Sequence, residues 1–379
     1  MLVNFSYKFR IYPNKNQKIL LEKHFGCVRH VWNFFLNERK EYYLNNKEDI
    51  EAKRIKGSLN YYDNCKKLTE IKKEKEWLKE INSQSLQASL KHLDGAYNMF
   101  FRKTHRFPQF KNKNRRQSFT IPQHFTIEKN KMFFPKFKEG IKINLHREYE
   151  GKFVVATLSK TPSSQYYISI CVEKEIQELP ANDNIIGIDV GIKDFAVCSD
   201  GKIFENKKHL IRKEKKLKSK QRHLSKKKKG SANRKKKRLI VAKLHQEISN
   251  SRNDYLHNIS HKLTSENQTI VIEDIRVKEL TKNPLLAKYI CDIAWGEFVR
   301  QLEYKSKWRG RNLIKIDRFF PSSKTCNNCN YINQELKLSD RIWTCPCCNS
   351  TLDRDFNASQ NILKQGLLVK VCNAVGVTV

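Results

Sequence analysis

Acidic residues and long apolar runs are scarce in this chain. Its 379 residues include 39 Asp or Glu against 75 Lys or Arg, which gives a formal net charge of +36. A free globular protein with this charge repels itself, and the usual remedy is a polyanionic partner whose condensed counterions are released on binding. The chain has no apolar run long enough to cross a bilayer, no lipidation signal, and no basic amphipathic helix with an apolar face to insert. We therefore expect nucleic acid, and no membrane, as its partner.

A secretory signal and a disulfide framework are also missing. Residues 1–12 alternate like a β-strand and lack the apolar core of a signal peptide. The 11 cysteines are odd in number, and five of them lie between positions 326 and 348, which is unlike a secreted disulfide scaffold. In a reducing compartment, clustered thiols indicate a metal site. We therefore expect a cytoplasmic protein.

The chain has enough apolar residues to build more than one core. Hydrophobic residues make up 39% of it and aromatic residues 11%, which argues against disorder, and the length suits two or three domains. Residues 3–12 alternate like a strand, whereas residues 15–103 repeat apolar positions at three- and four-residue steps, as helices do. The many aromatic residues of the helical stretch are expected in a helix-packing core, and base stacking is the alternative.

Strand-like alternation returns between residues 107 and 175, with turns of Lys, Asn and Gly between the segments. We expect a small antiparallel barrel there. The first strand could belong to that barrel, which would make residues 13–103 a helical insertion. Residues 180–184 (PANDN) are typical of a linker.

The remainder of the chain mixes buried strands with helices. The segment IIGIDV (185–190) predicts a buried strand, and residues 194–205 predict a hairpin with an Asp-Gly turn. A second buried strand is expected at 268–275, a helix at 289–308, a strand at 314–320 and a final helix at 355–368.

Residues 206–238 carry 18 Lys or Arg and a single acid, Glu214. Leu210, Leu217 and Leu224 recur every seven residues within this run, and the break at residues 229–231 predicts a helical hairpin. Such a hairpin could hold nucleic-acid backbone, or it could be a solvated face with no specific role. The basic residues near its tip that we single out for backbone contact are Lys226, Lys227, Arg234 and Lys235.

Two C-x-x-C pairs are the most specific local signal. Cys326 and Cys329 form one pair, and Cys345 and Cys348 form the other. This spacing suits one tetrahedral Zn²⁺ ion, and four thiolates would leave no open position, so the site is expected to be structural. Cys347 is a further candidate, but Cys348 completes the spacing of the second pair.

Acidic residues in apolar contexts are the second signal. Asp189 lies in a buried strand, Glu273 ends another strand, and Asp355 lies at the start of the last helix. A carboxylate in an apolar strand costs several kcal/mol unless it is paired or binds a cation. Each acid alone could cap a turn or helix or pair with a lysine. Together they favour a site for divalent cations such as Mg²⁺, which prefers oxygen ligands and bridges carboxylates to phosphate.

The motifs that carry these residues resemble the TnpB family of bacterial insertion sequences. The resemblance covers nearly the whole chain and rests on the following segments: YKFRIYPNKNQKILLEKHFG (7–26), SLQASLKHLDGAYNMFFRK (85–103), RFPQFKNK (106–113), GIDVGIKDFAV (187–197), VIEDI (271–275), WGEFVRQLEYKSKWRG (295–310), FPSSKTCNNC (320–329) and WTCPCCNSTLDRDFNASQNI (343–362).

The resemblance implies a multidomain α/β plus β-barrel fold. A wedge-type β-barrel would comprise residues 1–12 and 104–183, and a helical recognition domain would comprise residues 13–103. An RNase H-like RuvC nuclease domain would comprise residues 184–321 and 353–379, with the basic hairpin at 206–265. A zinc-binding segment that contacts target nucleic acid would comprise residues 322–352.

The resemblance also implies a function. Members of this family, which is related to type V CRISPR effectors, bind an RNA from the transposon end. That RNA guides them to double-stranded DNA beside a short transposon-associated motif. Asp189, Glu273 and Asp355 match the three catalytic acids. Spacing alone does not separate Asp353 from Asp355, but the family's DRDxNA pattern assigns Asp355. Gln87 lies in the helix that resembles the motif-reading part, although a plain surface glutamine is the alternative.

From this we expect a Mg²⁺-dependent DNA endonuclease with two Mg²⁺ ions and one structural Zn²⁺. It would act as a bacterial monomer with one guide RNA and would associate with the nucleoid when bound to DNA. Two alternatives stay open. One is a nuclease-silent, RNA-guided DNA-binding regulator, and the other is a transposase that joins DNA ends.

Overall fold

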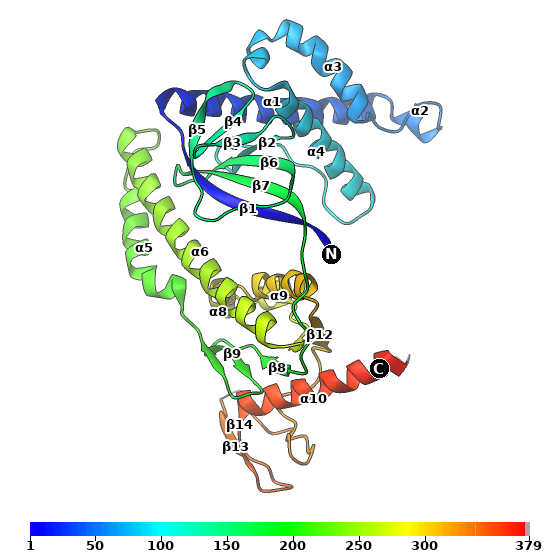
Figure 1. The fold of residues 1–379 in the computed structure, drawn as a ribbon, viewed down its shortest axis with the longest axis vertical. Helices are drawn as coiled ribbons and strands as arrows, with labels where there is room; N and C mark the ends of the chain where they lie inside the picture. The colour runs from blue at the N-terminus through cyan, green and yellow to red at the C-terminus, as the bar shows by residue number, and fades with distance from the viewer. Residues whose placement is uncertain (338, 376–379) are drawn as a thin grey trace. The chain divides into compact units, whose positions relative to one another are not determined.

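The computed structural model describes residues 1–337 and 339–375. Residues 338 and 376–379, which belong to the predicted zinc-binding segment and nuclease domain, lie outside the described residues. The chain folds into two compact units, one of Leu2–Glu175 and one of Met1 with Ile176–Val379 (Figure 1). No helix in the described ranges is long and apolar enough to cross a membrane.

The first unit opens with strand β1 and a set of helices. The elements are β1 (Leu2–Tyr12), α1 (Lys15–Asn45), α2 (Lys47–Glu51), α3 (Tyr61–Glu74), the 3₁₀ helix η1 (Glu76–Glu80) and α4 (Ser83–Phe101). Asparagine caps three of these helices. Asn14 and Asn60 each accept a hydrogen bond from the third residue of α1 and α3, and Asn82 caps α4. These caps fix where each helix begins.

A seven-stranded antiparallel sheet follows, and β1 lies near its centre. The strands are β2 (Gln117–Ile121), β3 (Thr126–Glu128), β4 (Lys131–Phe134), β5 (Phe137–Asn144), β6 (Lys152–Lys160) and β7 (Tyr166–Glu175). Their order is β2-β6-β7-β1-β5-β4-β3. The long pairing of β1 with β7, from Leu2↔Glu175 to Ile11↔Tyr166, ties the start of the chain to the end of the unit. This confirms that the first strand belongs to the sheet.

The closed barrel that we expected is not seen among the described strands. The edge strands β2 and β3 each pair with one neighbour and not with each other. These edges are joined by the short segment 122–125, so the sheet curls back on itself without closing. Pro122 provides no backbone donor, His124 adopts a positive φ of 57°, and β3 is only three residues long. Sequence alternation alone does not distinguish an open sheet from a barrel.

Helices and sheet share one hydrophobic core. Phe9 of β1, Phe35 of α1, Leu86 of α4 and Ile170 of β7 are all at most 1% exposed and belong to one cluster of buried side chains. The helical stretch therefore does not bury its apolar face by itself, but packs against the sheet that it interrupts.

The second unit is built on a five-stranded mixed sheet with order β10-β9-β8-β11-β12. The strands are β8 (Ile185–Asp189), β9 (Asp194–Cys198), β10 (Ile203–Glu205), β11 (Thr269–Glu273) and β12 (Asn312–Ile316). β8, β11 and β12 run parallel, while β9 and β10 form the antiparallel hairpin predicted from the Asp-Gly turn, where Gly201 has φ +82°. A small two-stranded sheet of β13 (Ile342–Thr344) and β14 (Thr351–Asp353) lies further along the chain.

The basic run forms the predicted helical hairpin. It consists of α5 (His209–Ser225) and α6 (Ala232–Glu266), which lie side by side (Figure 1). Leu210, Leu217 and Leu224 pack against Val241, Leu244 and Ile248 of α6. The heptad spacing thus places the leucines in the seam and leaves most lysines exposed.

The remaining helices are α7 (Val277–Leu280), α8 (Pro284–Ile293), α9 (Trp295–Arg309) and α10 (Arg354–Val375). The predicted helix at 289–308 is two helices, because Ala294 adopts a left-handed conformation with φ 59° and ends α8. α10 packs along β8, β9, β11 and β12.

Two glycines let α10 approach the sheet closely. A Cβ on Gly187 in β8 would lie 2.4 Å from the backbone oxygen of Ser359, and one on Gly366 of α10 would lie 2.3 Å from Val271 Cγ1. No carbon atom tolerates such distances. α10 can pack this closely against the sheet only because neither Gly187 nor Gly366 carries a side chain where the two elements touch.

We predict that Gly187→Ala lowers the free energy of unfolding of this unit by about 2 kcal/mol or more, because backbone rather than a flexible side chain must move. Urea denaturation followed by tryptophan fluorescence measures this change. Gly296→Ala is the matched control, because its Cβ would meet nothing closer than Val277 Cγ2 at 3.8 Å. An equal loss in both variants would contradict the packing argument.

Candidate active site and metal centre

Two of the predicted acids end neighbouring parallel strands. Asp189 is the last residue of β8 and Glu273 the last of β11, and Ile188 pairs with Ile272 in the residue before each. Residues at matched positions of parallel strands project from the same face of the sheet. Carboxyl ends of parallel strands are also where α/β sheets commonly hold ligands. Both side chains are partly buried.

The third acid comes from α10. Asp355 lies in the first turn of that helix, and its charge acts on Asp189 together with that of Glu273. Arg341 donates to both carboxylate oxygens of Asp355, at 3.3 and 3.2 Å. Asp353, the neighbour that spacing alone left open, is exposed and accepts a hydrogen bond from the Phe356 backbone N–H at 2.9 Å. Asp353 therefore caps α10, whereas the charge of Asp355 acts on Asp189.

Burial and mutual repulsion disturb these carboxyl groups. Burial, followed by the charges of Glu273 and Asp355, raises the pKa of Asp189 from 3.8 to about 7. Burial also raises the pKa of Glu273, and the Ser322 hydroxyl, which donates to Glu273 Oε1 at 2.5 Å, partly opposes that rise. A cation placed among these acids would relieve both the repulsion and the burial penalty.

These acids do not yet form a tight ligand set. Among the described residues, the sole group of three or more His, Cys, Asp or Glu side chains gathered around one point is the set of four cysteines. Asp355 is held by Arg341 and Glu273 by Ser322. The donors have the oxygen chemistry that suits Mg²⁺, and in the free protein two of the acids are paired with these neighbours instead.

The four predicted cysteines come together. The Sγ atoms of Cys326, Cys329, Cys345 and Cys348 all lie within 4.8 Å of one another, and the pairs 326–348 and 329–345 are each 3.6 Å apart. Sulfurs that ligate one tetrahedral Zn²⁺ at about 2.3 Å are about 3.8 Å apart. Cys347 is exposed and outside the set. The spacing argument for Cys348 agrees with this geometry.

The two cysteine turns have the same backbone design. The backbone N–H of Asn330 donates to the carbonyl of Cys326, and that of Asn349 donates to the carbonyl of Cys345, both at 2.9 Å. Both asparagines adopt positive φ. Asparagine tolerates this left-handed conformation better than most residues. Each turn therefore directs the sulfur of its second cysteine towards that of its first. Trp343 packs beside the buried Cys326 and Cys345.

Buried asparagines of α10 connect this centre to the acids. Asn357 and Asn361 are one helical turn apart, and both amides donate to the Thr325 carbonyl, at 2.7 and 2.6 Å. Asn361 also donates to the Ser322 carbonyl at 2.8 Å. The segment from Ser322 to Cys326 is thereby fixed to α10, and Ser322 in turn contacts Glu273. Sequence reasoning missed these residues, although all lie in the motif segments 320–329 and 343–362.

The predicted nucleic-acid contacts lie in both units. Gln87 is exposed on α4. Lys226, Lys227 and Lys235 are exposed around the tip of the α5–α6 hairpin. Arg234 has a structural task, since its Nη1 donates to the carbonyls of Leu224 and Lys227 at 3.0 and 2.9 Å. It closes the turn between the helices, and its role in backbone contact stays a prediction.

Comparison with known families gives three matches. Residues 169–284 match a family described as "Probable transposase" (OrfB_IS605), and residues 295–362 match a "Cas12f1-like, TNB domain" family. Residues 1–48 match a family described as "Helix-turn-helix domain", although here they form a strand and the single long helix α1, followed by the start of α2.

Several relatives match almost the whole chain, and two of them are at least 31% identical to it. A Streptomyces pristinaespiralis protein named "Putative RNA-guided DNA endonuclease" is 39% identical over 97% of this chain and 90% of its own length. The Escherichia coli protein "Putative RNA-guided DNA endonuclease InsQ" is 31% identical over 97% and 93%. A solved Cas12f1–sgRNA–target DNA complex matches 95% of this chain and 99% of its own at 16% identity, with a TM-score of 0.37.

We predict that Asp189→Asn changes how stability depends on pH. The folded-state pKa of Asp189, about 7, exceeds its ordinary value of 3.8. The contribution of Asp189 to the free energy of unfolding is therefore fully present below about pH 4 and is lost as the pH rises through 7. Without added divalent ions, the variant should be more stable than the parent at pH 8 by roughly 2–4 kcal/mol and about equal at pH 4. Urea unfolding at several pH values measures this, and parallel pH profiles would contradict it.

We predict that Cys345→Ser abolishes stoichiometric zinc binding, because three thiolates hold the ion far more weakly than four. Cys347→Ser is the matched control and should retain about one zinc ion per chain. Elemental analysis of the purified proteins counts the metal. Retention of zinc in the Cys345 variant, or its loss in the Cys347 variant, would show that the ligand set is different.

Proposed function

Because the chain belongs to the TnpB (OrfB) family of insertion-sequence proteins, we propose that it is an RNA-guided DNA endonuclease that cuts target DNA beside a transposon-associated motif. The proposal extends to this chain the activity named for two relatives that match it along almost its whole length. A guide RNA that pairs with the target would read its sequence, and the protein would hold the backbone and read the short motif.

The observation that carries this proposal is the electrostatic coupling of the three acids at one end of the sheet. Asp189 and Glu273 end adjacent parallel strands, and α10 brings Asp355 close enough to raise the pKa of Asp189. The strand order, with an antiparallel hairpin beside parallel strands, supports an RNase H-like RuvC nuclease domain. Acids with only capping or surface roles would have no reason to converge at the end of a sheet.

In this proposal Asp189, Glu273 and Asp355 would hold two Mg²⁺ ions. Bound there, Mg²⁺ would supply an activated water and stabilise the charge on the attacking and leaving oxygens of a phosphodiester. The chain's own residues orient the acids. Ser322 donates to one oxygen of Glu273, and Arg341 pairs with Asp355. In the bound complex Arg341 would exchange this carboxylate for a phosphate oxygen of the substrate.

The distribution of charge supports two nucleic-acid partners, guide RNA and target DNA. The formal net charge is +36, and the α5–α6 hairpin exposes a dense set of lysines. Neutralising phosphates along an RNA and a heteroduplex accounts for such an excess. The zinc centre would order the segment between β12 and α10, which carries Ser322 and Arg341 beside the acids.

We predict that Asp189→Ala, Glu273→Ala and Asp355→Ala each reduce guided DNA cleavage by on the order of a thousandfold or more, with guide-dependent binding retained. Asp353→Asn is the matched control, because it keeps the α10 cap and should cleave like the parent. The chain, co-expressed with the flanking transposon-end RNA, is tested in Mg²⁺ on a plasmid library with a randomised motif.

The outcomes separate the candidate functions. Guide-dependent cuts beside one enriched motif, lost in the three variants, would establish the endonuclease. Guided binding without cutting would indicate a silent regulator. DNA joining without a guide would indicate a transposase, and loss of activity in the Asp353 variant alone would overturn the assignment of Asp355.

A further inference from the structure

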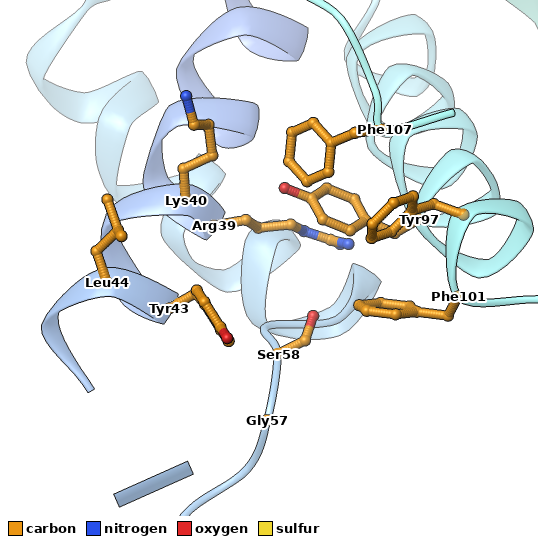
Figure 2. A pocket seen from close by; sticks show the side chains of 10 residues that line it. Arg39, Lys40, Tyr43, Leu44, Gly57, Ser58, Tyr97, Phe101 and Phe107 are labelled. Carbon is orange, nitrogen blue, oxygen red and sulfur yellow. The ribbon is translucent and has the colours of Figure 1, made fainter. Parts of the chain in front are cut away.

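The first unit contains a cavity that the proposed cleavage chemistry does not use. It has a volume of about 410 Å³ and lies between α1, the loop at Gly57 and Ser58, and the end of α4. This volume lies within the range of about 300–1,000 Å³ that is typical of small-molecule sites. Figure 2 shows Tyr97 and Phe101 projecting from one helix towards Arg39 and Tyr43 on the other. The walls are mainly aromatic and aliphatic.

A buried hydroxyl without a partner faces this cavity. Tyr97 is 6% exposed, and its hydroxyl has no hydrogen-bond partner among the described residues. In Figure 2 the oxygen points away from its own helix, towards the side chains of α1. Buried hydroxyl groups almost always have a partner, and leaving one without a partner costs about 1–3 kcal/mol. The cavity therefore presents one unused polar contact within an apolar wall.

Arg39 forms part of the cavity wall and is fixed by two contacts. The Arg39 guanidinium donates to Asp94 at 2.9 Å and lies 4.9 Å from the centre of the Tyr97 ring. Because Asp94 balances its charge, the Arg39 guanidinium contributes a planar surface to the cavity wall rather than an unpaired cation. Phe101 is 59% exposed at the rim, where a ring can stack on an incoming planar group.

The chain segment that leaves the cavity wall at the end of α4 is basic. No Asp or Glu occurs between residues 95 and 127. That stretch contains seven Lys or Arg, which are Arg102, Lys103, Arg106, Lys111, Lys113, Arg115 and Arg116. Lys40 lines the cavity itself. Of the basic residues in the stretch, Arg102 and Lys103 directly follow Phe101 in the chain, and Arg106 directly precedes Phe107, another residue of the cavity wall. An apolar peptide or a lipid tail would gain nothing from these cations, whereas a nucleotide would place its base in the aromatic cavity and its phosphate outside.

We propose that this cavity captures one unpaired base of the bound RNA, with Phe101 and Tyr97 against the base and the Tyr97 hydroxyl bonded to its edge. The inference rests on the proposed function for the identity of its ligand. RNA is the favoured source because its loops and bulges present bases that are already unstacked, whereas a paired DNA base must first be extruded at a cost of a few kcal/mol. The base would anchor the RNA to the first unit.

Photocrosslinking provides the direct test. The photoreactive residue p-benzoylphenylalanine replaces Phe101 in the full chain, which is purified with its RNA, and reverse transcription maps the crosslinked nucleotide. The control places the same residue at Tyr62, an aromatic residue of the same unit that is 72% exposed and does not line the cavity. We expect one defined RNA position from site 101 and none from site 62. Crosslinks to DNA, to protein, to scattered RNA positions or to nothing would overturn the proposal.

Affinity measurements on full-length variants provide the second test. Phe101→Ala should weaken RNA binding about tenfold, as expected from losing one base–aromatic stack. Tyr97→Phe should weaken it about threefold without lowering the melting temperature, because the lost hydroxyl has no partner in the free protein. Tyr62→Ala should bind like the parent. Unchanged RNA affinity in both cavity variants would overturn the proposal.

Failure of this proposal and failure of the proposed function are distinguishable. If the parent complex makes guided cuts but shows no defined crosslink at site 101, the cavity proposal is wrong and the endonuclease stands. If site 101 crosslinks one RNA base but no guided cutting occurs, the cavity proposal stands and the endonuclease is wrong.

Discussion

The candidate active site depends on the close packing of α10 against the mixed sheet. Gly187 and Gly366 mark the two crossing points where any side chain would collide with the opposing element. Because the helix lies so near, its first turn brings Asp355 to the end of the parallel strands. Its next turns bring Asn357 and Asn361 to the segment that leads into the cysteine centre. One helix thus sets the geometry of the acids and of the metal centre together.

The electrostatics of the acids follow from that packing. Burial raises the pKa of Asp189 to about 7, and the charges of the neighbouring acids add to this rise. A fold selected for stability alone would place asparagine or an apolar residue there, since an unpaired buried carboxylate is costly. The retained acid is therefore an argument for a bound cation. The side interactions of Glu273 with Ser322 and of Asp355 with Arg341 reduce the repulsion among the acids.

Local signals in the sequence predicted the elements well. The alternation in residues 3–12, the Asp-Gly turn at 200–201, the heptad leucines and the paired C-x-x-C turns each encode a structure within a few residues. The barrel prediction was wrong because closure depends on whether two edge strands pair, and neither edge carries a sequence mark of that pairing. The helix expected at 289–308 is interrupted because a single residue, Ala294, takes a left-handed conformation that the helical period does not reveal.

The parts that the sequence did not predict all depend on residues far apart in the chain. Arg341 meets Asp355 and Ser322 meets Glu273 only because α10, β11 and the cysteine segment converge. The aromatic cavity likewise combines α1, a loop near Gly57 and the end of α4. Sequence analysis placed the aromatic residues of this stretch in a helix core, with base stacking as the alternative. The structure divides them: Phe35 is buried in the shared core, while Tyr43 and Phe101 remain partly exposed at the cavity. Aromatic residues at helical spacing can therefore pack in the core at some positions and line a cavity at others within one unit. Which role each serves is decided by the tertiary position of its ring.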